Sequence, residues 1–237
     1  MHGGGYVMGR PKMDDRRCLN YVRGLGITVA SVDYRLAPKH PFPAALDDAY
    51  AALQWLAAQA DELGLDPDRI AVGGASAGGG MAAALAQLAQ DRGEVRPAFQ
   101  FLIFPMLDDR TVGRADLEDK RFVLWNQRSN RFAWEAYLGR PAGAADASRV
   151  DVAEYAAPAR RVDLSGLPPA WIGVGTEDLF YSEGAAYAQR LRDCGVDCAF
   201  EAVQGAYHGF DVYGGDKPIV YDFRAAQLAA LRKNLYS

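Results

Sequence analysis

Histidine and cysteine are scarce in this sequence, which has only three of each among 237 residues. The cysteines, Cys18, Cys194 and Cys198, are an odd set, and we interpret them as reduced, partly buried thiols, which favours a cytoplasmic location. The histidines are not clustered with them along the chain, so we expect no metal site.

Long apolar runs and an excess of positive charge are also missing. No run approaches the roughly 20 apolar residues that a transmembrane helix requires. The formal net charge is −4, and the arginines and lysines are scattered along the chain. A nucleic-acid-binding surface would gather basic residues on one face. We therefore expect neither a membrane nor a nucleic acid as a partner.

Half of the residues are hydrophobic, which suits one α/β domain spanning residues 1–237. Apolar periodicity and turn residues alternate along the chain in a pattern typical of a doubly wound, mostly parallel sheet with helices on both faces. We expect strands over 27–32, 69–72, 99–104, 171–174 and 199–203. We expect helices over 14–24, 44–63, from 77 through 88, 185–194 and 218–236.

Residues 108–169 differ from the rest of the chain. This segment is polar, carries no clear strand and is inserted between two predicted core strands. Trp125 and Trp134 fall in its predicted helical stretches. We expect a cap-like helical insertion over the pocket, with the two tryptophans supplying apolar surface near the functional site or at the seam between cap and core.

The most informative motif is Gly74-Ala75-Ser76-Ala77-Gly78, between a predicted strand and an alanine-rich helix. The pattern G-x-S-x-G is typical of the nucleophile elbow of α/β-hydrolases, a sharp turn whose crowding requires glycine on both sides of the serine. The following helix would point its N-terminal amides at the charge that develops during acyl transfer. The alternative is a glycine-rich turn that buries a serine without function.

A serine nucleophile needs a general base, and His208 is the candidate because it follows the fifth predicted strand, where parallel sheets build their sites. The base needs a carboxylate to orient it. Asp178 follows the fourth predicted strand and fits the order Ser, Asp, His. Glu177 and Glu183 are close competitors for that role.

An oxyanion hole needs backbone N–H donors aimed at one point, and a glycine run brings bare backbone close enough to supply them. Gly3, Gly4 and Gly5 form such a run after His2. The second donor would be the amide of Ala77, the residue after the proposed nucleophile.

Seven motifs occur in one order along essentially the whole chain: HGGGY at 2–6, DYRLAP at 33–38, PFPAA at 41–45, GASAGG at 74–79, LPPA at 167–170, GTED at 175–178 and HGF at 208–210. In this combination the sequence resembles the hormone-sensitive-lipase-like family of carboxylesterases. The sequence departs from the family at Ala75, where Asp is common, at Lys39, where Glu is common, and over residues 179–182.

The resemblance implies an α/β-hydrolase that hydrolyses short- to medium-chain carboxylic esters without a cofactor. It implies a small-molecule ester as substrate, Ser76 as nucleophile, His208 as base and Asp178 as its partner. The oxyanion donors would be the amides of Gly4, Gly5 and Ala77. His2 would shape the glycine loop.

The resemblance also implies a stretch before the HGGG loop that holds cap helices and the first strands, one of them between the strand at Ile27 and the elbow strand. We therefore expect an N-terminally incomplete sheet whose open edges favour a homo-oligomer. Two alternative functions stay open: a non-catalytic small-molecule-binding protein, or an inactive truncated product on the same fold. The related gibberellin receptors lack the catalytic histidine, whereas His208 is present here and favours the enzyme.

Overall fold

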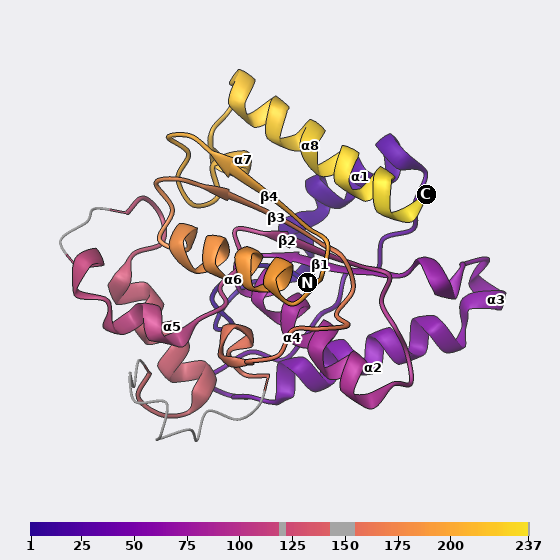
Figure 1. The fold of residues 1–237 in the computed structure, drawn as a ribbon, viewed down its shortest axis with the longest axis horizontal. Helices are drawn as coiled ribbons and strands as arrows, with labels where there is room; N and C mark the ends of the chain where they lie inside the picture. The colour runs from indigo at the N-terminus through magenta and orange to yellow at the C-terminus, as the bar shows by residue number, and fades with distance from the viewer. Residues whose placement is uncertain (119–121, 143–154, 237) are drawn as a thin grey trace.

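A parallel sheet forms the centre of the computed structural model, which describes residues 1–118, 122–142 and 155–236 (Figure 1). In these residues the sheet has four strands in the order β1-β2-β3-β4. Ala71 lies opposite Phe99 in the register of the first two strands, and Ala170 lies opposite both Gln100 and Cys198. The strands are β1 (Ala71–Ala75), β2 (Phe99–Ile103), β3 (Ala170–Gly175) and β4 (Cys198–Val203).

Helices cover both faces of the sheet. In Figure 1, α1 and α8 lie on one face and α2, α4 and α6 on the other. The α-helices are α1 (Asp15–Leu25), α2 (Ala44–Ala58), α3 (Ala60–Leu63), α4 (Ala77–Arg92), α5 (Gln127–Leu138), α6 (Tyr181–Asp193), α7 (Phe210–Tyr213) and α8 (Pro218–Leu235). Short 3-10 helices occur at Pro11–Asp14, Pro67–Arg69, Asp109–Gly113, Ala115–Leu117 and Pro158–Arg160. The predicted doubly wound α/β fold is confirmed.

The core has one apolar cluster on each face of the sheet. On the α4 side, a run of small residues such as Ala82 and Ala86 is fully buried, so the helix backbone packs close to the strands. On the α8 side, the rings of Phe101 and Trp171 stack with centroids 5.1 Å apart, and Trp171 also contacts Phe223 of α8. Burial on both faces explains why β2 and β3 read as nearly continuous apolar runs.

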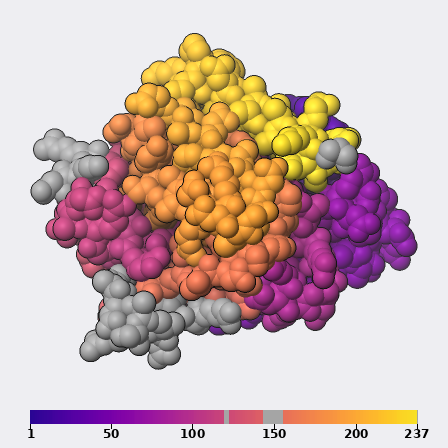
Figure 2. All heavy atoms as spheres, in the orientation of Figure 1, coloured from indigo at the N-terminus to yellow at the C-terminus, as the bar shows by residue number. Residues whose placement is uncertain are grey.

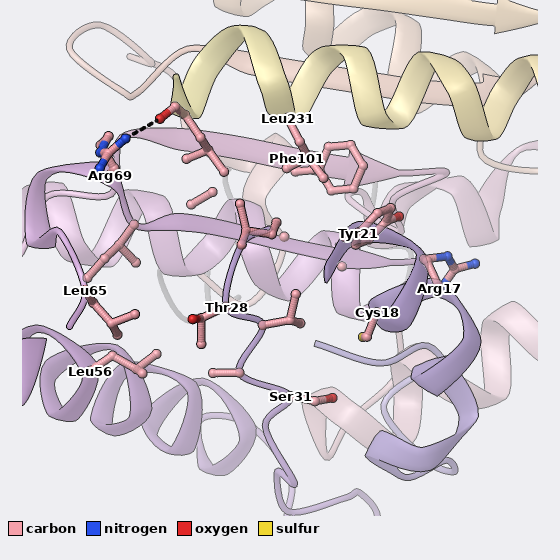
Figure 3. A pocket seen from close by; sticks show the side chains of 18 of the residues that line it. Arg17, Cys18, Tyr21, Thr28, Ser31, Leu56, Leu65, Arg69, Phe101 and Leu231 are labelled. Atoms are coloured by element: carbon pink, nitrogen blue, oxygen red, sulfur yellow. Dashed lines mark hydrogen bonds between the residues drawn. The ribbon is translucent and has the colours of Figure 1, made fainter. Parts of the chain in front are cut away.

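The predicted strand over residues 27–32 is wrong. This segment has no strand assignment and no ladder partner among the described residues, although Ile27 and Val29 pack against the α8-side core. A groove of about 360 Å³ separates it from β1, so its backbone has no neighbouring strand to bond with. Figure 3 shows the groove, with Leu56 and Leu65 on the α2 side, Leu231 of α8 on the other, and Thr28 between them.

The predicted insertion is described in part, because residues 119–121 and 143–154 lie outside the described residues. Its helix α5 lies on the left of Figure 1, the side on which α7 follows β4, and its surface forms the left flank of the face in Figure 2. Trp134 is in α5 and is fully buried. Trp125 precedes the helix rather than lying in it, because Asn126 caps α5 by accepting from the Ser129 amide.

None of the helices in the described ranges combines the length and the apolar character that crossing a bilayer would demand.

Candidate active site

Ser76 occupies a sharp turn between β1 and α4, with φ 57° and ψ −121°. An L-residue rarely adopts this conformation, so the surrounding structure must hold it. The Ser76 amide donates to the Ile103 carbonyl at 2.9 Å, which continues the pairing of β1 with β2. The Ser76 carbonyl accepts from the amides of Gly80 and Met106, both at 3.0 Å. Three backbone bonds therefore fix the turn that presents the hydroxyl.

The glycines of the elbow are required by close backbone contacts. A Cβ on Gly74 would lie 2.4 Å from the carbonyl carbon of Gly78. A Cβ on Gly78 would lie 2.2 Å from the carbonyl oxygen of Met1. Because the clashing atoms are backbone atoms, a side chain at either position would move the strand, the helix or the N-terminal segment that runs beside the turn.

Loops after β3 and β4 bring two further predicted residues to Ser76. His208 Nε2 lies 3.0 Å from Ser76 Oγ, and His208 Nδ1 lies 2.8 Å from Asp178 Oδ2. Asp178 Oδ1 accepts from the Phe180 amide at 2.9 Å, so both carboxylate oxygens have a partner. All three residues are buried, with 3% to 8% of their surface exposed. The structure thus joins Ser76, His208 and Asp178 in one hydrogen-bonded chain.

The two competing carboxylates lie elsewhere. Glu177 is exposed. Glu183 is buried in α6 and accepts from the Leu107 amide at 2.6 Å and from the Thr111 hydroxyl, which ties α6 to the segment after β2. Burial raises the pKa of Glu183 well above its ordinary value, although these donors oppose the shift. Glu183 is a packing residue, and Asp178 is the carboxylate that contacts the histidine.

Three aromatic side chains surround the His208 ring. Phe104 and Phe180 meet it edge-on, with centroids at 4.7 and 5.2 Å, and both are buried. The third, Trp125, lies 6.5 Å away and is partly exposed. The two phenylalanines therefore fix the imidazole plane, while the indole borders solvent.

The glycine loop passes directly beside the nucleophile. A Cβ on Gly3 would lie 3.4 Å from Ser76 Cβ. Gly4 and Gly5 have φ values of 119° and 60°, which glycine adopts without strain. The predicted oxyanion residues Gly4, Gly5 and Ala77 thus belong to the two backbone segments that flank Ser76.

His2 braces this loop. Its Nδ1–H donates to the Gly3 carbonyl at 2.7 Å, and its ring stacks on Tyr34 at 4.1 Å. The Tyr34 hydroxyl donates to the His2 carbonyl at 2.7 Å. Burial lowers the pKa of His2, which favours the neutral imidazole. The sequence marked Tyr34 only as part of a motif, and its role in bracing the loop follows from the fold.

Like Tyr34, Trp125 contacts the glycine loop in a way that the sequence did not predict. A Cβ on Gly5 would lie 2.3 Å from Cη2 of the indole, so this edge of the ring packs closely against the glycine. The sequence marked Trp125 as apolar cap surface, but nothing in its spacing linked it to the glycine loop.

The large groove beside β1 is separate from this site, because none of Ser76, Asp178 and His208 lines it. Within the described residues, no group of three or more histidines, cysteines and acidic residues is placed to hold a metal ion. The groups that meet at the site are a hydroxyl, an imidazole and a carboxylate.

Comparison with known proteins agrees with this geometry. A family model described as the alpha/beta hydrolase fold matches residues 1–212. The carboxylesterase NlhH of Mycobacterium tuberculosis is 36% identical over 238 residues, which cover 100% of this chain and 73% of NlhH. The esterase LipI of the same species is 36% identical over 243 residues, covering 99% of this chain and 72% of LipI.

A solved structure of a bacterial heroin esterase matches with a TM-score of 0.93 at 41% identity, over 100% of this chain and 74% of that chain. These identities extend over the whole chain, and they agree with the motifs of the glycine loop, the elbow and the histidine loop. The chain therefore belongs to the alpha/beta-hydrolase family and, within it, to the carboxylic ester hydrolases of the hormone-sensitive-lipase-like group.

Proposed function

We propose that this protein hydrolyses short- to medium-chain carboxylic esters through an acyl-enzyme on Ser76. The observation that carries the proposal is the chain of hydrogen bonds from Ser76 Oγ through His208 to Asp178, at 3.0 and 2.8 Å. A protein that only binds a small molecule on this fold has no need of a base in contact with the serine, so the geometry favours catalysis over simple binding.

Acylation begins when Ser76 Oγ attacks the ester carbonyl carbon while its proton passes to His208 Nε2. Asp178 accepts from Nδ1–H, fixes the tautomer that presents Nε2 as a base and stabilises the imidazolium that forms. When the tetrahedral intermediate collapses, the bond from the carbonyl carbon to the alcohol oxygen breaks. The imidazolium returns the proton to that oxygen, and the alcohol leaves.

The negative charge on the carbonyl oxygen would be held by the amides of Gly4, Gly5 and Ala77. Ala77 opens α4, so the helix dipole adds to its amide. Removing one such fixed donor lowers the rate about 10²–10³-fold. The start of this loop is held by His2, whose ring bonds the Gly3 carbonyl, and by Tyr34, whose hydroxyl bonds the His2 carbonyl.

Deacylation repeats these steps with water. His208 takes a proton from the water, the resulting hydroxide attacks the acyl carbon, and the bond to Ser76 Oγ breaks. The proton on His208 then returns to Ser76, and the carboxylic acid leaves. Every step uses a side chain, a backbone amide or water.

The test is turnover of p-nitrophenyl esters of increasing acyl length by the full chain, with Ser76→Ala as the matched control. We expect hydrolysis that is fastest for short to medium acyl chains and is lost in the variant. Equal turnover by Ser76→Ala, or no turnover of any ester, would contradict the proposal.

We further propose that residues 108–169 form a cap-like helical insertion over the pocket. Contacts of Trp125 with Gly5 and His208 support this for the described part of the segment. We also propose that the protein is cytoplasmic, since Cys18, Cys194 and Cys198 are all free thiols.

Finally, we propose that the chain self-associates through the open edge of β1. This strand pairs only with β2 in the described sheet, and the groove on its other side is lined in part by apolar side chains such as Leu56, Leu65 and Leu231. An unpaired strand edge is a template for pairing with another chain.

A further inference from the structure

We propose that Trp125 is a specificity-determining residue that selects esters whose leaving alcohol carries an aromatic ring. The inference rests on the proposed ester hydrolysis at Ser76 and adds the chemical class of the alcohol. Its basis is the position of one partly exposed indole between the glycine loop and the catalytic histidine.

The indole lies between the glycine loop and the imidazole that contacts the Ser76 hydroxyl. Its Cη2 end packs against Gly5, and its centroid lies 6.5 Å from that of His208 at an interplanar angle of 40°. Phe104 and Phe180 also contact the imidazole, but they are 3% and 0% exposed. Trp125 is therefore the aromatic neighbour of His208 whose ring remains available to a substrate.

The chemistry of the reaction places the alcohol on this side. His208 Nε2 must protonate the leaving oxygen, so that oxygen comes within hydrogen-bond reach of the imidazole. The group attached to the oxygen then extends along the wall next to His208, which the indole supplies. Exposed apolar side chains continue this wall outward, since Leu124 and Tyr213 both lie within 3.5 Å of the Cβ position on Gly209 and are more than half exposed.

The indole is held in place rather than free to rotate. Its Nε1–H donates to Asn130 Oδ1 at 3.3 Å, and Asn130 is fully buried in α5. The Trp125 amide donates to the Val123 carbonyl at 2.8 Å, and Leu124 between them has φ 66°. A ring fixed in this way offers its face to a second ring with little loss of side-chain entropy, which makes aromatic contact more favourable than contact with an aliphatic group of the same size.

The experiment compares benzyl acetate with cyclohexylmethyl acetate, two esters of similar size that give the same acetyl-enzyme. Because deacylation is common to both, the ratio of their kcat/KM values reports only the step in which the alcohol is still present. We expect the wild-type protein to favour benzyl acetate, and Trp125→Leu to lower that ratio by about 2- to 10-fold, the range expected for one aromatic pair. Trp125→Phe should keep most of the preference because it restores a ring.

Phe132→Leu is the matched control, since it removes an aromatic ring that is 60% exposed on α5. It should leave the ratio unchanged. A ratio that changes less than twofold in Trp125→Leu would overturn the inference, as would an equal loss for both esters, which would mark Trp125 as a support for Gly5 alone. Failure of the proposed function is a different result: the wild-type protein would then hydrolyse neither ester faster than Ser76→Ala.

Discussion

The two edges of β1 are held in different ways. On one edge, β1 pairs with β2 along Ala71–Ala75, and the pairing continues through the Ser76 amide into the elbow. On the other edge, the Gly73 carbonyl accepts from Met1 N at 2.7 Å, and beyond Met1 lies a groove of about 360 Å³. One strand therefore separates a tightly bonded region from an open one.

The proposed catalytic groups are divided between these regions. Ser76, Asp178 and His208 follow β1, β3 and β4, whose register is fixed by continuous ladders. The glycine loop enters from the groove side, where His2 and Tyr34 brace it. The comparison teaches that the proposed triad depends on the paired sheet, whereas the proposed oxyanion loop depends on contacts across its open edge.

The largest effect is expected in the paired region. Ser76→Ala and His208→Ala should each lower kcat/KM for a p-nitrophenyl ester at least ~10³-fold and up to ~10⁶-fold, because members of a triad act as a unit. His40→Ala is the control, because His40 lies between the DYRLAP and PFPAA motifs and takes no part in the hydrogen-bonded chain. Near-normal turnover in either triad variant would contradict the assignment.

Asp178→Asn should lower kcat on the order of 10²–10⁴-fold, a smaller loss than that of Ser76→Ala or His208→Ala. The amide keeps the shape of the side chain, and one oxygen still accepts from Phe180, but the imidazole loses the anion that fixes its tautomer. Circular dichroism should show an unchanged fold. Glu177→Gln, one residue earlier and exposed, should retain full activity. If Glu177→Gln is the damaging substitution instead, the acid is misassigned.

Substitution at the open edge of β1 should have a smaller effect, on self-association of the chain rather than on ester hydrolysis. Sedimentation velocity of the wild-type chain should show concentration-dependent self-association. Thr28→Lys places a charge in the groove (Figure 3) and should raise the concentration needed for association several-fold, because a charged side chain blocks edge pairing. Ala58→Lys adds the same charge on exposed α2 surface and should change nothing. Identical association of both variants would place the contact elsewhere.

The smallest effect concerns the pH dependence of stability in the paired region. In the folded chain the pKa of Glu183 is raised well above its ordinary value of 4.5, because burial disfavours the anion. Above pH 4.5, ionisation of Glu183 therefore favours the unfolded chain. The contribution of Glu183 to the free energy of unfolding is fully present below that pH and is lost as the pH rises through the pKa of the folded state.

Glu183→Gln should remove this slope, which urea titrations between pH 4 and 9 would measure. The wild-type free energy of unfolding should fall relative to that of the variant as the pH rises. Glu177→Gln, in which an exposed carboxylate is removed, should keep the wild-type slope. A variant that is equally less stable at every pH would show that Glu183 contributes hydrogen bonds only.

Prediction from sequence worked where local pattern and fold agree. The apolar runs at β2 and β3 and the glycine-flanked serine at the elbow all lie where their patterns indicated. The run at 27–32 has the same composition as a buried strand, but a strand exists only with a partner at ladder distance, and the groove lies where that partner would be. Local pattern does not contain that information.

The sequence by itself determined which groups the proposed chemistry uses: one serine in a glycine-flanked turn, one histidine after the last strand, and a glycine run, because each of these needs particular residue types at particular spacings. Only the tertiary structure decided which carboxylate meets His208, since Asp178 and Glu183 differ in direction and partners rather than in type. It alone also placed Trp125 between Gly5 and His208. These contacts join residues far apart in the chain, 30 residues apart for Asp178 and His208 and 76 for Leu107 and Glu183, and such pairs are set by how helices and strands pack, not by any local periodicity.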